Sequence, residues 1–220
     1  MKKYLAILLF LMCAAAALAQ PQSSNNKAQP SDPKAKAAVD KAVSKLQSGA
    51  FQTEIKIFFT APTGEKDSQN GTMKLYGNKF YLKTDEFENF FDGKTQWVYV
   101  QSDNEVTISE PTKEELQTIS PLFIIKNFDK THRVDFELNA PKDNFWHINL
   151  FPIDKKSGDY FKIILTINQT NNEVKKIEIM QKNGEKFAVN FENYTSIKPD
   201  NQTFTFVQKN YPKVVVNDMR

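Results

Sequence analysis

Residues 51–59 read Phe-Gln-Thr-Glu-Ile-Lys-Ile-Phe-Phe, and this stretch decides the fold class. The side chains at 51, 53, 55, 57 and 59 form one set, which alternates with the polar residues Gln52, Glu54 and Lys56. Successive side chains of a β-strand point to opposite faces, so a period of two predicts a strand with one buried face.

Similar alternating segments recur along the chain, with turn signals such as Gly77-Asn78, Asp92-Gly93 and Asn183-Gly184 between them. We expect strands at about 71–76, 79–84, 87–91, 95–101, 104–109, 132–138, 145–151, 160–168, 173–181 and 185–194. Many short consecutive strands joined by tight turns predict an antiparallel meander, and therefore a mainly β protein with a minor helical part (α+β).

Two segments have helical patterns instead. Asp32 suits an N-cap and Pro33 a first helical position, and apolar residues then recur at three- and four-residue steps until Gly49, which predicts a helix over about 33–47. Residues 110–131 contain a helix start at Pro111 and a second at Ser120-Pro121, followed by a strongly apolar stretch. This insertion is either a fixed cover of the sheet or a movable lid.

The N-terminus has the pattern of an export signal. Lys2 and Lys3 precede an apolar stretch over 4–17, and Ala17-Leu18-Ala19 forms an A-x-A cleavage site. We therefore expect a signal peptide over 1–19, a flexible polar leader over 20–32 and one domain over 33–220. An uncleaved membrane anchor, or a lipoprotein acylated at Cys13, is the alternative.

Charge and cysteine content exclude some function classes. Without residues 1–19 the chain retains 201 residues, with 27 basic against 26 acidic side chains and no cysteine. We therefore expect no nucleic-acid partner, and stability from a hydrophobic core rather than disulfides. The 18 phenylalanines fit either an aromatic core or an interior that also binds an apolar ligand.

Motifs for catalysis, metal or cofactor binding are not found in the sequence. The glycines fall at apparent turns and form no phosphate-binding loop, and His132 and His147 lie on separate predicted strands. Carboxylates cluster at Asp85, Glu86, Glu88 and Asp92, which we interpret as a solvated strand edge. We expect no enzyme activity and no cofactor.

Residues 90–99, Phe-Phe-Asp-Gly-Lys-Thr-Gln-Trp-Val-Tyr, resemble the DGKTxWxY stretch of the periplasmic outer-membrane lipoprotein carrier family (LolA). Residues 70–76 are similar to the family's preceding strand, and residues 120–125 to its apolar lid helix. Phe204-Thr205-Phe206 with Pro212-Lys213-Val214 is similar to its closing pattern. The resemblance runs from the first helix to Arg220.

This resemblance implies an unclosed barrel of about eleven antiparallel strands, with helices over its concave apolar face. It also implies a monomeric periplasmic carrier that accepts acylated lipoproteins from an inner-membrane ABC transporter and passes them to an outer-membrane acceptor. Acyl chains need such shelter because exposing them to water costs about 0.8 kcal/mol per methylene.

The ligand would contact apolar side chains of the concave face and the lid, for which ordinary core packing is the alternative role. The expected site residues are Ile55, Ile57, Phe59, Leu75, Phe80, Phe91, Trp97, Tyr99, Leu122, Phe123 and Ile125.

The sequence departs from the family at two places. The family commonly carries an Arg-Pro pair after the second strand, and its arginine holds the lid closed by hydrogen bonds. Here the stretch reads Tyr76-Gly77-Asn78-Lys79, and a lysine lacks the planar donor fork of arginine. Val214-Val215 also stands where a glycine is usual. Two alternatives therefore remain, an envelope-stress sensor of the same fold that binds a partner protein and an outer-membrane-anchored acceptor.

Overall fold

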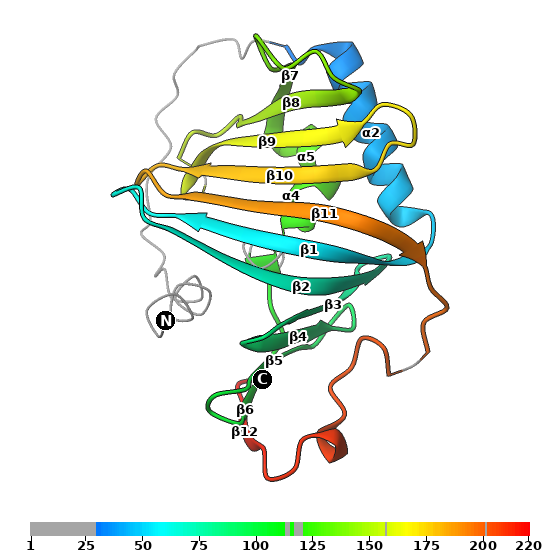
Figure 1. The fold of residues 1–220 in the computed structure, drawn as a ribbon, viewed down its shortest axis with the longest axis vertical. Coiled ribbons are helices and arrows are strands. Elements are labelled where there is room, and N and C mark those ends of the chain that lie inside the picture. Colours follow the sequence, from blue (N-terminus) through cyan, green and yellow to red (C-terminus); the bar gives the residue numbers. More distant parts are fainter. Residues whose placement is uncertain (1–29, 113–114, 117–120, 157, 201) are drawn as a thin grey trace.

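A twelve-stranded sheet forms the body of the protein in the computed structural model (Figure 1). The structure describes residues 30–112, 115–116, 121–156, 158–200 and 202–220. The expected signal peptide and most of the leader therefore lie outside the described residues. The strands are β1 (Ala50–Thr60), β2 (Lys66–Tyr76), β3 (Lys79–Thr84), β4 (Phe87–Phe91), β5 (Gln96–Val100), β6 (Glu105–Ser109), β7 (His132–Phe136), β8 (Phe145–Pro152), β9 (Tyr160–Asn168), β10 (Val174–Gln181), β11 (Lys186–Ser196) and β12 (Val215–Asp218).

The sheet is open, because β7 lies at one edge and β12 at the other. The order across it is β12-β6-β5-β4-β3-β2-β1-β11-β10-β9-β8-β7, and neighbouring strands are antiparallel except for β12 and β6. This confirms the predicted unclosed antiparallel architecture. The twelfth strand, β12, was not predicted: its four residues are all exposed, so no burial pattern marks it.

Helix α2 (Pro33–Gln47) forms where the sequence predicts it. The Asp32 carboxylate accepts hydrogen bonds from the backbone amides of Lys34 and Ala35, at 2.8 and 3.0 Å, and Pro33 occupies the first turn. Small apolar side chains let the helix lie close to β7, β8 and β9. Its buried residues are Ala35, Ala38, Val39, Ala42 and Leu46.

One face of the sheet, here called the inner face, packs against the helices. Cross-strand pairs place Ile55 of β1 beside Phe191 of β11, and Leu75 of β2 beside Phe80 of β3. These residues belong to one buried cluster with the apolar side chains of α2. The main hydrophobic core is therefore the layer between the inner face and the helices. The opposite side of the sheet is called the outer face.

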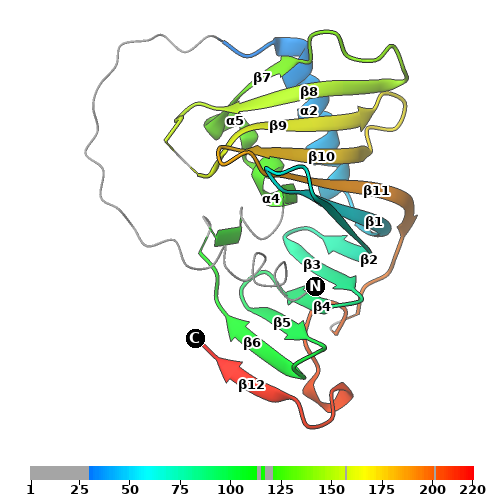
Figure 2. The ribbon, with the colours of Figure 1, turned by 60° about the vertical axis from the view of Figure 1, so that its left-hand side comes forward.

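The connection between β6 and β7 crosses the inner face. β6 lies beside one edge strand and β7 is the other edge strand, so the chain must cross the width of the sheet between them. Helices α4 (Pro121–Lys126) and α5 (Phe128–Thr131) lie on this path (Figures 1 and 2). The predicted second helix of the 110–131 insertion is therefore confirmed. Of the first, residues 115–116 are helical and the remainder is only partly described.

Candidate functional site

Three phenylalanines join α4 to the inner face. Phe80 of β3 and Phe91 of β4 are cross-strand partners with ring centroids 5.5 Å apart. Phe123 of α4 meets both rings edge-on, at 6.2 and 5.9 Å. Phe80, Phe91 and Phe123 are 1%, 2% and 8% exposed, so this part of α4 is inserted into the apolar layer. Edge-to-face pairs of this kind add packing energy beyond the area they bury.

Most of the predicted site residues come together at this place. One buried cluster contains Ile55, Ile57, Leu75, Phe80, Phe91, Phe123 and Ile125. Phe59 is partly buried, and its pairing with Phe187 places it on the inner face as well. The side chain of Leu122 lies outside the described part of the chain. Whether these residues contact a ligand remains a prediction, because core packing also explains their burial.

Trp97 and Tyr99 were expected on the inner face, and that placement is wrong. The turn between β4 and β5 pairs Phe91 with Gln96, and Phe90 with Trp97. Cross-strand partners share a face, so Trp97 lies on the outer face with Phe90, and Tyr99 follows it two residues later. The sequence predicts the alternation within each strand correctly. Which set faces inward depends on the pairing across the turn.

The apolar inner surface is bounded by polar groups near β5. Gln96 and Asn89 are almost fully buried, and the side-chain amide of Gln96 donates a hydrogen bond to the side-chain oxygen of Asn89 at 3.0 Å. Ser109 of β6 lies 3.5 Å from the Gln96 oxygen. Buried amides need such partners, and an apolar ligand in their place would leave them unpaired. The continuous apolar part of the inner face therefore lies under α4 and α2.

Lys126, at the end of α4, contacts the hairpin between β2 and β3. Its ammonium group donates a hydrogen bond to the Gly77 carbonyl oxygen and lies 4.9 Å from the centroid of the Phe123 ring. In this contact the donor belongs to the helix and the acceptor to the hairpin. The sequence analysis missed Lys126, although a basic residue that ends an apolar helix was the available signal.

The position of Lys126 is electrostatically unfavourable. Burial lowers the pKa of its ammonium group from 10.5 to about 8, which means that the charged form is partly desolvated. α4 has only six residues, and a helix of this length is not stable without tertiary contacts. The apolar contacts of Phe123 and Ile125 therefore hold α4 in place against the cost of a half-buried charge.

A second aromatic cluster, here called the outer cluster, lies on the outer face. Its members are Phe90, Val106 and Phe206, with Tyr81, Trp97, Tyr99, Tyr211 and Val214 packed around them. At its edge the Glu88 carboxylate accepts hydrogen bonds from Tyr81 at 2.7 Å, Tyr211 at 3.0 Å and Lys83 at 3.1 Å. Glu88 is only 6% exposed, so its expected place on a solvated edge is wrong. The C-terminal segment, which sequence pattern does not place, covers it.

Other chemistry is not evident in the described part of the chain. His132 is buried and hydrogen-bonded to Tyr160 at 3.0 Å, and burial lowers the pKa of its imidazole to about 4. Among the described residues, no group of His, Cys, Asp and Glu is arranged to hold a metal ion. None of the described helices is both long and apolar enough to cross a membrane.

The chain is similar to several solved structures at low sequence identity. An uncharacterized conserved protein from Thermus thermophilus is 13% identical, with 84% of this chain and 99% of that chain covered and a TM-score of 0.55, which supports the shared fold. A LolA superfamily protein from Nitrosomonas europaea is 18% identical over 78% of this chain and 97% of its own, with a TM-score of 0.43. A chain of the Pseudomonas aeruginosa MucA/MucB complex is 11% identical, with 80% of this chain and 62% of that chain covered and a TM-score of 0.40.

The family assignment rests on sequence. No curated protein matches the chain. A family model described as outer membrane lipoprotein carrier protein LolA matches residues 27–185, which run from just before α2 to the β10–β11 turn. The match includes the 90–99 motif and α4, whereas the C-terminal closing pattern lies beyond it. Family members are binding and carrier proteins of the cell envelope. This chain belongs to the LolA family of outer membrane lipoprotein carrier proteins.

Proposed function

We propose that this protein is a periplasmic carrier that binds the acyl chains of lipoproteins under α4 and moves them from the inner to the outer membrane. The observation that carries the proposal is the placement of α4. This short helix covers the apolar inner face through Phe123 and Ile125, and it does so with the Lys126 charge half-buried beside it. Such a cover closes the apolar surface and is inexpensive to displace.

The competition between α4 and an acyl chain for the apolar surface fits transport of cargo better than its storage. Each methylene transferred from water to an apolar site gains about 0.8 kcal/mol. The side chains of α4 occupy part of this apolar surface, so a ligand must displace them. The net affinity is the free energy gained by burying the acyl chain minus the free energy needed to displace α4. A carrier needs this difference to be moderate, because it must also release its cargo.

The proposed steps of export, loading and delivery follow from the family to which the chain belongs. The segment 1–19 would export the chain and be removed, an inner-membrane ABC transporter would supply acylated lipoproteins, and an outer-membrane acceptor would receive them. The proposed contacts are the inner-face residues of the buried cluster together with Phe59 and Leu122. The mechanism requires no covalent step and no cofactor, because binding and release depend only on burial of apolar surface.

Phe123→Glu tests the site directly. A carboxylate among Phe80 and Phe91 would be desolvated by a bound acyl chain, so we expect binding of a fluorescent fatty-acyl probe to weaken at least about tenfold. Release of an acylated lipoprotein from inner-membrane vesicles should fall with it. Far-UV circular dichroism would report whether the sheet remains folded.

Phe161→Glu is the matched control, because Phe161 on β9 is already 50% exposed. It introduces the same charge on the same sheet away from α4, and should leave probe binding and release unchanged. Unchanged lipoprotein release by a folded Phe123→Glu variant would contradict the assignment of the site.

A further inference from the structure

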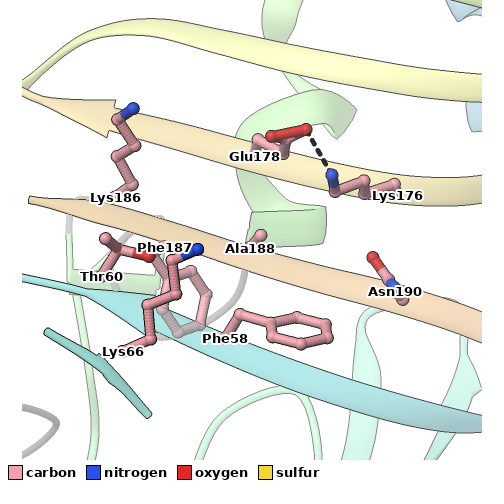
Figure 3. A pocket seen from close by; sticks show the side chains of 9 residues that line it. All are labelled: Phe58, Thr60, Lys66, Lys176, Glu178, Lys186, Phe187, Ala188 and Asn190. Carbon is pink, nitrogen blue, oxygen red and sulfur yellow. Dashed lines mark ion pairs between the residues drawn. The ribbon is translucent and has the colours of Figure 1, made fainter. Parts of the chain in front are cut away.

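The outer face of the sheet has a depression over β1, β10 and β11, on the side opposite α4 (Figure 3). Its volume is about 270 Å³. Phe58 and Ala188 contribute apolar surface, while Lys66, Lys176 and Lys186 bring ammonium groups to it. We call this feature the outer depression. An aromatic surface within a ring of lysines is uncommon on a solvated sheet, where polar side chains usually cover the exposed face.

Positive charge is concentrated around the outer depression. The strand register places five lysines on this part of the outer face, namely Lys56, Lys66, Lys162, Lys176 and Lys186. It also places Glu54 and Glu192 on this face, but beyond Lys56 and Asn190 and away from the end that carries Lys66 and Lys186. The carboxylate that lines the depression, Glu178, is paired with Lys176 at 2.6 Å. Within the described part of the chain, Lys66, Lys162 and Lys186 form no ion pair. Because the whole chain is close to neutral, this face is a local positive field rather than part of a generally basic surface.

Two details of the depression favour a ligand with hydrogen-bond donors and apolar groups. The side-chain oxygen of Asn190 is buried and has no hydrogen-bond partner among the described residues, which is energetically unfavourable. A bound polypeptide could reorient the Asn190 side-chain amide and donate a hydrogen bond to its oxygen, which would remove the cost of the unpaired atom. Phe58 is only partly buried, with the Lys56 ammonium 5.3 Å from its ring centroid, so part of an aromatic surface remains available.

Charge rules out two occupants from this protein itself. Residues 20–29 of the leader include Lys27 and no acidic side chain, so they do not complement the lysines. A second copy that presented its own outer depression would bring like charges together. A flat anionic membrane would contact the lysine tips, but it would not fill a recess with an apolar group.

We infer that the outer depression binds an acidic segment of a partner protein, with an apolar side chain against Phe58 and carboxylates beside Lys66 and Lys186. The partner would approach the face opposite α4, so cargo under α4 and partner on the outer face can be bound at the same time. A carrier that must be recognised while loaded needs such an arrangement. The inference does not depend on the identity of the cargo.

The test uses a fluorescein-labelled peptide of the sequence Gly-Glu-Asp-Glu-Phe-Glu-Asp-Glu-Gly and the whole exported chain, followed by fluorescence anisotropy at low salt. We expect saturable binding that Lys66→Glu/Lys186→Glu weakens at least about tenfold, since two attractions become repulsions. Replacing the central Phe of the peptide by Gly should weaken binding severalfold. Acyl-probe binding should be unchanged in the double variant, which separates this site from the one under α4.

The matched control is Lys41→Glu/Lys209→Glu, which changes the net charge equally at two exposed positions on α2 and in the C-terminal segment. It should change the peptide Kd less than about twofold. Absence of peptide binding at low salt, or equal weakening by both double variants, would overturn the inference. So would binding of phosphatidylglycerol vesicles with the same dependence on Lys66 and Lys186 in the absence of peptide binding, which would assign the lysines to a membrane surface.

Discussion

Phe123 on the inner face and Phe206 on the outer face hold equivalent positions in two aromatic clusters. Each packs edge-on against a phenylalanine of β4: Phe123 against Phe91 at 5.9 Å, and Phe206 against Phe90 at 5.9 Å. Their exposed fractions are also equal within a percentage point, 8% and 9%. The two residues therefore offer a controlled comparison of how a cluster is covered.

The covers differ in how they are attached. The C-terminal segment over the outer cluster is fixed by hydrogen bonds from Tyr211 to Glu88, from Asn104 to the backbone oxygens of Pro212 and Lys213, and by pairing of β12 with β6. α4 over the inner cluster carries Lys126, whose half-buried charge opposes the closed position. Aromatic packing alone therefore does not identify a binding site. The free energy needed to remove the cover distinguishes a site from a core.

The largest expected effect is a difference in stability between Phe206→Ala and Phe123→Ala. Truncating a buried phenylalanine usually costs about 3–5 kcal/mol, and we expect Phe206→Ala to lower the free energy of unfolding by about 3 kcal/mol. Phe123→Ala should lower the free energy of unfolding by about 1 kcal/mol or less. α4 can leave the sheet before the whole protein unfolds, so the contacts of Phe123 stabilise the fold by no more than the free energy with which α4 docks on the sheet.

Urea denaturation followed by tryptophan fluorescence and circular dichroism would measure both values. Native-state hydrogen exchange should place the amides of α4 among the least protected, with those of β12 closer to the global value. Equal losses of stability in the two variants would mean that α4 is as integral to the fold as the C-terminal segment.

A smaller effect is expected from Lys126→Met. Methionine keeps the length and packing of the side chain but removes the half-buried charge, so α4 should close more firmly. A firmer cover competes better with ligand, and the affinity for the acyl probe should fall about fivefold, equivalent to about 1 kcal/mol. Lys130→Met on the neighbouring helix α5 is the control, since Lys130 is exposed. Tighter probe binding by Lys126→Met would show that the hydrogen bond to Gly77 outweighs the cost of burying the charge.

The smallest expected effect is a pH dependence of probe affinity, which is also caused by the half-buried ammonium group of Lys126. The pKa of Lys126 is about 8 in the folded protein and 10.5 when exposed, so between these values the unfolded chain binds more protons and the closed state gains stability as pH rises. Probe affinity should therefore fall about threefold between pH 7.5 and 9.5, after allowance for solvent screening. Lys126→Met should show no such change.

The outer cluster should respond to pH in the opposite sense. Burial and the neighbouring Glu88 carboxylate raise the pKa of Tyr81 and Tyr211, so stability from these groups is retained up to about pH 10 and lost above it as the unfolded chain ionises. Working below pH 10 keeps the two effects apart. A probe affinity that is flat from pH 7.5 to 9.5 in the wild type would contradict the role given to Lys126.

Local signals predicted most of the secondary structure. The capping pattern at Asp32 and Pro33 predicted α2, and alternation with turn residues predicted eleven of the twelve strands. Both signals depend on neighbouring residues only, which is why they could be read from the chain. β12 has no such signal, because four exposed residues form a strand only where β6 offers its edge.

The candidate site was predictable in part. Seven of the eleven expected residues share one buried cluster, to which four neighbouring strands and α4 contribute apolar side chains. Trp97 was misplaced because the pairing across a turn, not the alternation, decides which set faces inward. The contacts of Glu88 with Tyr211 and of Lys126 with Gly77 could not be predicted from sequence, because these partners are distant along the chain and adjacent only in the fold.

The sequence by itself therefore determined eleven of the twelve strands, the helix α2 and the family, since these follow from local periodicity and short motifs. Only the tertiary structure decided which aromatic residues face the helices, what covers each cluster and where charge is buried. These properties depend on the three-dimensional register of strands and on desolvation, and both are set by contacts between segments far apart in the chain.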